Sequence, residues 1–177
     1  MRTRTRLTVR EITVFAMLGA VMFAGKKLVE WIPNVHPATM LTMVYTLAYR
    51  KKGIIPVIVY LVLETVFTGG ITWLVPYYYI FPLCWLCTLL LPRHLPKWGA
   101  QICYTLLCTL FGLLFGVLYA PWQAILYGLS FEKTLAWVAS GFAFDVTHAV
   151  GNFAASFLIF PLLNLLQKIN QSKGADG

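Results

Sequence analysis

Charged residues are scarce in this chain, and acidic ones are the scarcest. Asp and Glu number 6 against 14 Lys and Arg, and charged residues make up 11% of the 177 positions. A soluble domain carries about 25% charged residues. Because 59% of the residues are hydrophobic, the composition excludes an ordinary soluble domain and predicts an integral membrane protein.

Several functional motifs are also absent from the sequence. No G-x-x-x-x-G-K-[ST] pattern occurs, so the chain cannot bind ATP by that device. Cys84 and Cys87 have C-x-x-C spacing but lack a second pair, and all four cysteines lie in hydrophobic segments, which predicts apolar packing rather than a metal site. The basic residues are dispersed rather than gathered into a stripe with aromatics, so we expect no nucleic-acid partner.

Hydropathy and helix breakers predict an all-α bundle of six transmembrane helices, forming one membrane-embedded domain over residues 1–177. The expected ranges are 11–30, 38–49, 54–68, 75–91, 99–120 and 141–167. Arg50–Lys52 should divide the second helix from the third, because one continuous helix would place three cations near the bilayer centre at about 2.5–3.5 kcal/mol each. Residues 119–141 are expected to form an outer loop with partial helix.

The distribution of lysine and arginine predicts the orientation. All but three of the 14 cations fall at the termini or in alternate connections, and the exceptions are Lys26, Lys27 and Lys133. Cytoplasmic loops are enriched in Lys and Arg, so both termini are expected to be cytoplasmic. No small-x-small cleavage site precedes Lys26, so the first apolar run is interpreted as a membrane helix rather than a signal peptide.

On this topology, polar and aromatic residues gather in the outer half of the membrane. Asp145, His148 and Asn152 have i, i+3, i+7 spacing, which places them on one helix face. Ionisable residues inside a membrane usually face a cavity or a partner, and aromatic walls suit a flat ring-containing ligand. The other substrate-binding candidates are Asn34, His36, Glu64, Trp73, Tyr77, Tyr78 and Trp85.

Plainer interpretations exist for the same residues. Asp145 and His148 can form a hydrogen-bonded pair that only joins helices, and the tyrosines can belong to an interfacial aromatic belt. A membrane-embedded enzyme that uses Asp145 and His148 as an acid–base pair is a further alternative, although no nucleophile motif accompanies them. A purely structural subunit is another. We expect no metal ligand, because a lone histidine more often forms hydrogen bonds.

Ala16, Ala20 and Ala24 recur at intervals of four in the first predicted helix. Small residues at this spacing let a second helix approach closely, which is a main source of helix association in lipid. The partner helix belongs either to the same bundle or to another protein.

Together with "WIPNVHPATML" and "FDVTHAVGNF", the alanine stripe and the six-helix pattern resemble the S components of energy-coupling factor (ECF) vitamin transporters. The resemblance implies a multi-pass subunit of the bacterial plasma membrane that binds a vitamin near the outer surface. It also implies that Ala16, Ala20 and Ala24 dock on a transmembrane T subunit. Two partner ATPases would hydrolyse ATP, so this chain would be non-catalytic and bind no cofactor.

The resemblance also suggests a substrate. The segments "PNVHP" and "YYYIFPLCW" are similar to those of lactobacillar S components linked with cobalamin, so cobalamin or a related corrinoid is the first expectation. Pockets diverge among proteins that share a fold. Riboflavin, pyridoxine-type vitamins and other ring compounds therefore stay open.

Overall fold

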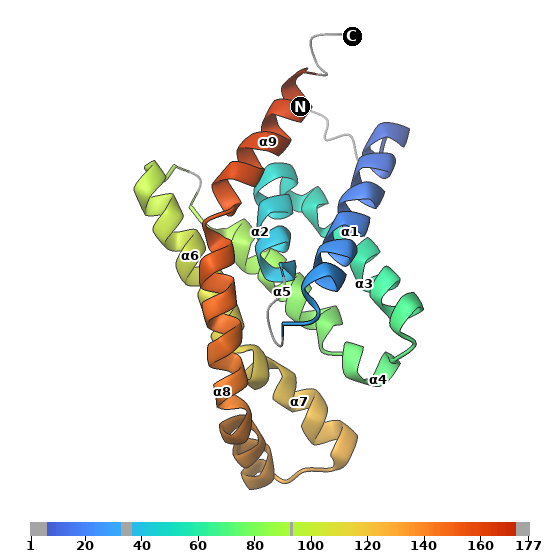
Figure 1. The fold of residues 1–177 in the computed structure, drawn as a ribbon, viewed down its shortest axis with the longest axis vertical. Coiled ribbons are helices and arrows are strands. Elements are labelled where there is room, and N and C mark those ends of the chain that lie inside the picture. The colour runs from blue at the N-terminus through green and yellow to red at the C-terminus, as the bar shows by residue number, and fades with distance from the viewer. Residues whose placement is uncertain (1–6, 33–36, 93, 173–177) are drawn as a thin grey trace.

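The computed structural model describes residues 7–32, 37–92 and 94–172, except the side chains of Ile71, Gln171 and Ser172. Within these residues every regular element is helical, which confirms the all-α prediction (Figure 1). The elements are α1 (Val9–Val29), α2 (Ala38–Tyr49), the 3-10 turn η1 (Arg50–Gly53), α3 (Ile54–Thr68), α4 (Ile71–Leu74), α5 (Tyr77–Leu90), α6 (Lys97–Leu113), α7 (Phe115–Tyr127), α8 (Phe131–Ser156) and α9 (Ile159–Ser172).

Several helices can cross a membrane by length and composition. Among the described residues, Val9–Val29, Thr72–Leu90 and Lys97–Tyr127 are long and apolar enough, and α8 with α9 adds a fourth if this pair, bent by 46°, counts as one span. α2 and α3 have only 12 and 15 residues. The start of α1 and the end of α9 lie at the same end of the molecule (Figure 1). Six spans and cytoplasmic termini stay predictions.

α2 is the central helix of the bundle. Every residue from Ala38 to Thr46 is buried, and α2 packs on α1, α3, α5, α6 and α9. A helix that is apolar all round is typical of a core position. Thr42 and Thr46 donate their hydroxyl hydrogens to the carbonyls of Ala38 and Thr42, at 2.8 and 2.6 Å, so no polar group of these side chains needs water.

α1 packs closely against α3 at Gly19. A Cβ atom at Gly19 would lie 2.5 Å from Cγ1 of Val59 and 2.9 Å from the carbonyl oxygen of Pro56. The buried face of α1 consists of Phe15, Gly19, Met22 and Lys26. Only glycine at this position allows the observed approach of the two helices.

The basic turn between α2 and α3 lies where the sequence predicts it. Arg50 has a φ of 54°, and its Nη2 donates to the carbonyl of Leu89 at 3.0 Å. Nε1 of Trp85 donates to the carbonyl of Arg50 at 3.4 Å. The turn is therefore tied to the end of α5, and the three cations stay out of the middle of a helix.

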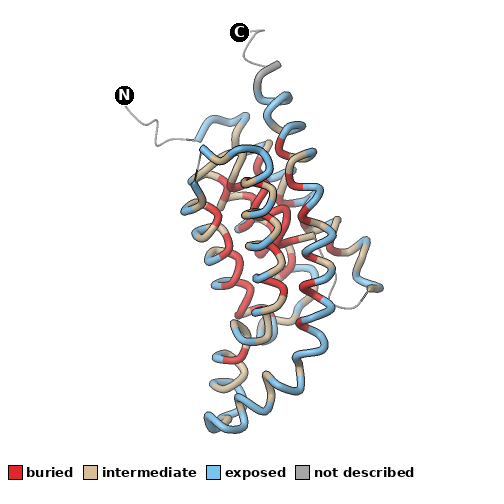
Figure 2. Tube along the Cα trace, turned by 90° about the vertical axis from the view of Figure 1, so that its left-hand side faces the viewer, coloured by how far each residue is buried: buried red, intermediate tan, exposed pale blue. Residues whose placement is uncertain are grey.

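The expected outer loop at 119–141 is instead a helical hairpin of α7 and α8, which projects from the bundle (Figure 1). Gly128, with φ 62°, ends α7, and the Ser130 side chain accepts a hydrogen bond from the Lys133 amide, so α8 begins at Phe131 rather than near 141. The projecting end is largely exposed (Figure 2). The final helix also breaks after Ser156 instead of continuing to 167.

Candidate functional site

A buried ion pair joins α1 to α3. Glu64 on α3 is completely buried, and its Oε1 pairs with Nζ of Lys26, while Nζ of Lys27 lies 4.0 Å from the same oxygen. Glu64 Oε2 has no hydrogen-bond partner among the described residues. A buried carboxylate needs an opposite charge close by, and Lys26 supplies that charge to Glu64. Glu30 follows the last residue of α1, and the hydrogen bond that it accepts from Lys27 lowers its pKa.

Two aromatic rings complete this cluster. Nζ of Lys26 lies 5.2 Å from the ring centroid of Trp73 and 5.4 Å from that of Tyr77, distances at which cation–π attraction operates. A Cβ at Gly70 would lie 2.1 Å from Nε1 of Trp73, so glycine there lets the indole fold back over the chain. The structure thus brings Glu64, Trp73 and Tyr77 together, as their shared depth predicts.

Lys26 is the member of the cluster that the sequence interpretation missed. The sequence predicts it only as one of the outer-side cations at the end of the first helix, whereas it lies inside α1 and is 7% exposed. A signal was available, because Glu64 within an apolar helix requires a cation at the same level. Lys26 and Lys27 are the cations nearest to that level.

The other two candidate residues on α5, Tyr78 and Trp85, lie away from the Lys26 cluster. The hydroxyl of Tyr78 hydrogen-bonds Oγ1 of Thr65 at 2.7 Å, on the exposed side of α3 and α5. Trp85 contacts Arg50 at the other end of α5, so it does not share the depth of Trp73. Asn34 and His36 lie outside the described residues.

Asp145, His148 and Asn152 share one buried face of α8, as their spacing predicts. Oδ1 of Asp145 accepts from the Gly116 amide at 2.9 Å, and Nδ2 of Asn152 donates to the carbonyl of Cys108 at 3.0 Å. The His148 ring lies 4.8 Å from that of Phe115. These contacts join α8 to α6 and α7.

α6 and α8 pack closely along the seam between them. A Cβ at Gly112 would lie 2.8 Å from the Cα of Ala149, so α6 and α8 touch through their backbones. Further along, Oγ of Ser156 and Oγ1 of Thr105 form a hydrogen bond of 2.9 Å. Polar groups on this face of α8 are therefore used mainly to hold helices together.

Asp145 has a second environment, since it also lines a pocket between α7 and α8 of about 320 Å³. The rings of Tyr119 and Trp137 stack at its side with centroids 6.1 Å apart and planes 24° apart. Among the described residues, Asp145 is the charged member of the lining. The described lining consists of Phe115, Gly116, Tyr119, Gln123, Trp137, Val138, Gly141, Phe144 and Asp145.

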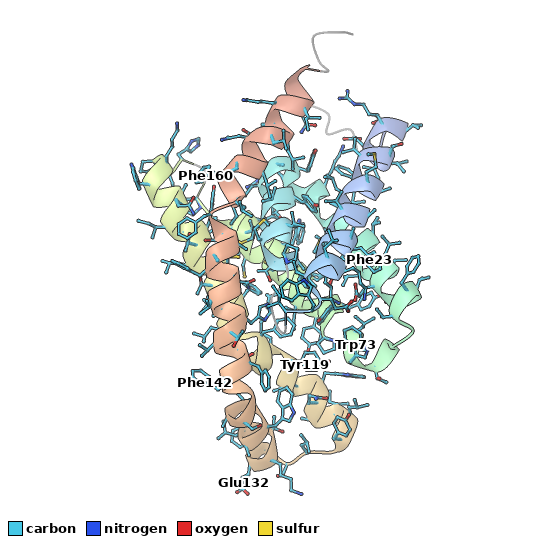
Figure 3. All side chains as sticks on the ribbon, viewed as in Figure 1. Phe23, Trp73, Tyr119, Glu132, Phe142 and Phe160 are labelled. Atoms are coloured by element: carbon cyan, nitrogen blue, oxygen red, sulfur yellow. The ribbon has the colours of Figure 1, made fainter. Side chains whose placement is uncertain are left out.

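An aromatic wall connects this pocket with the Lys26 cluster. The Tyr77 ring lies 5.8 Å from the rings of both Trp73 and Phe115. The hydroxyl of Tyr119 donates to the carbonyl of Trp73 at 2.5 Å, and Figure 3 shows these two residues together where α4 meets α7.

The alanine stripe lies on a different face of α1 from Gly19. Ala16, Ala20 and Ala24 are all exposed, so the described bundle does not use them for internal contacts. Met17 and Val21 on the same side are 63% and 56% exposed. This face is open to lipid or to a partner helix.

Protein-family models, curated proteins and solved structures give no match to this chain. Among the described residues, no group of three or more His, Cys, Asp or Glu side chains is arranged to hold a metal ion.

Proposed function

We propose that this chain is the substrate-binding S component of an ECF-type vitamin importer in a bacterial plasma membrane. It captures a vitamin at the outer face and delivers it by associating with a T subunit and two ATPases. Both termini lie in the cytoplasm, and the α7–α8 hairpin points outward. The sequence resemblance supports this assignment, as does the polar and aromatic character of the hairpin end.

The observation that carries the proposal is the exposure of Ala16, Ala20 and Ala24. A stripe of small residues favours close helix contact, and internal packing of α1 is already supplied by Gly19 on another face. An exposed stripe therefore fits docking of a helix from another membrane protein. In the resembling family that partner is the T subunit.

The pocket size bears on the substrate. Its volume of about 320 Å³ lies at the low end of the range of about 300–1,000 Å³ for small-molecule sites. A corrinoid contains four linked pyrrole-type rings and exceeds this space unless α7 and α8 separate. Compact ring vitamins of the pyridoxine type therefore fit better than cobalamin, and riboflavin stands between them.

The enzyme alternative gains no specific support. Asp145 and His148 contact α7 at different residues, Gly116 and Phe115, as packing groups do.

Ala20→Trp tests the docking assignment. We expect vitamin uptake by cells to be lost while the purified chain keeps its affinity, because the indole blocks the helix contact without entering the bundle. Ala154→Trp, at an exposed position of α8, is the matched control and should leave uptake intact. Loss of binding in Ala20→Trp would assign the stripe to internal packing, and normal uptake would remove it from the docking surface.

A further inference from the structure

The pocket between α7 and α8 is built around a fixed carboxylate. Asp145 is only 6% exposed, and its Oδ1 accepts the Gly116 amide at 2.9 Å. A Cβ at residue 116 would lie 2.3 Å from Oδ2, so glycine at this position makes room for the carboxylate. The sequence therefore holds Asp145 at the pocket wall in one orientation.

This carboxylate differs from Glu64 in its charge balance. Glu64 is neutralised by Lys26 of α1, whereas Asp145 forms no ion pair within the part of the chain that the structure describes. Among the residues that the structure describes, the pocket lining likewise contains no lysine or arginine. A lone negative charge in a site of low dielectric attracts a cation or an N–H donor and repels an anion.

The walls of the pocket favour the same class of ligand. Tyr119 and Trp137, whose rings stack on each other, line the same pocket as Asp145. Aromatic faces attract cations and also stack on flat rings. Gln123 adds an amide that can donate to or accept from a ring substituent.

We infer that this pocket selects a compact planar ring that carries a positive charge or N–H donors, with the donor directed at Asp145 and the ring against Tyr119 and Trp137. The inference deepens the proposed function and rests on it. It names the charge class of the vitamin, which the resemblance leaves open, and it disfavours vitamins whose recognised group is a carboxylate or a phosphate.

A matched pair of probes tests this selection. Pyridoxamine and 4-pyridoxic acid share one ring but carry an ammonium group and a carboxylate, respectively. We expect the purified full chain, measured by calorimetry in lipid nanodiscs, to bind pyridoxamine about tenfold or more tightly than 4-pyridoxic acid. Thiamine, a cationic two-ring compound, extends the comparison to a larger ligand.

Two variants attribute the preference to this pocket. Asp145→Asn should reduce the pyridoxamine preference to about threefold or less, whereas Glu132→Gln, at an exposed acidic residue of the same helix, should leave it unchanged. Because Asp145→Asn also alters a helix contact, Trp137→Leu provides a second variant. Trp137→Leu should weaken cation binding about tenfold, whereas Trp137→Phe should keep most of the affinity because it retains an aromatic ring.

Equal or tighter binding of 4-pyridoxic acid would overturn the inference, as would an unchanged preference in both Asp145→Asn and Trp137→Leu. Absence of binding by every cationic ring tested would also overturn it. None of these results touches the uptake defect of Ala20→Trp, so failure of this inference is distinguishable from failure of the proposed function.

Discussion

Replacing Lys26 by methionine should destabilise the protein more than any other single loss of charge in α1. The substitution leaves Glu64, which is fully buried, without its main partner, and removal of one member of a buried ion pair costs about 3–5 kcal/mol. It also removes the cation from the rings of Trp73 and Tyr77, a contact worth about 2 kcal/mol when desolvated. Lys27, 4.0 Å from Glu64, can recover part of this loss.

The free energy of unfolding in detergent, measured for a double-mutant cycle, is the suitable assay. We expect Lys26→Met to cost about 3–5 kcal/mol, and the double variant Lys26→Met with Glu64→Leu to recover most of it, because no buried charge remains. Lys27→Met is the matched control. Its ion pair with Glu30 is substantially exposed and contributes about 0–1 kcal/mol. Equal costs for Lys26→Met and Lys27→Met would refute the reasoning.

Three further substitutions test the packing. Gly19→Val should separate α1 from α3 and lower the unfolding temperature, because overpacking costs about 1–3 kcal/mol or more and the Cβ would lie 2.5 Å from Val59; an unchanged midpoint in thermal unfolding contradicts this close approach. Gly70→Ala should displace the indole of Trp73 and shift the tryptophan emission spectrum, and an identical spectrum would place the indole elsewhere. Asn152→Leu should cost about 1 kcal/mol in the same unfolding assay through the lost bond to Cys108, and a neutral result would remove Asn152 from the seam.

Local features of this fold were predictable from the sequence. The division of the apolar stretch at Arg50–Lys52 follows from the cost of burying three cations, and the shared face of Asp145, His148 and Asn152 follows from helical periodicity. Both conclusions depend on residues close together in the chain.

The greater depth of Trp85, about two turns of helix beyond the tyrosines, was also predictable from the sequence. Tyr77 and Trp85 are eight residues apart, a rise of about 12 Å along a helix. Because α2 and α3 have only 12 and 15 residues, this rise carries Trp85 down to Arg50, away from Trp73.

The hairpin and the role of Asp145 depend on tertiary structure. The sequence around Gly128 and Glu132 is typical of a loop. A helix nevertheless begins there, because Ser130 caps its N-terminus and the Glu132 carboxylate lies in its first turn. The sequence alone left open whether Asp145 packs helices or faces a ligand. The structure shows both environments, because Gly116 holds one carboxylate oxygen while the residue lines the pocket of α7 and α8.

Equilibrium vitamin binding by the purified chain, without ATP or partner subunits, tests the central claim most directly. Isothermal titration against a panel of ring-containing vitamins should show one compound bound in a 1:1 ratio with nanomolar Kd, a value that corresponds to about −12 kcal/mol. No binding to any vitamin in the panel, or chemical conversion of a bound compound by the chain alone, would contradict the account.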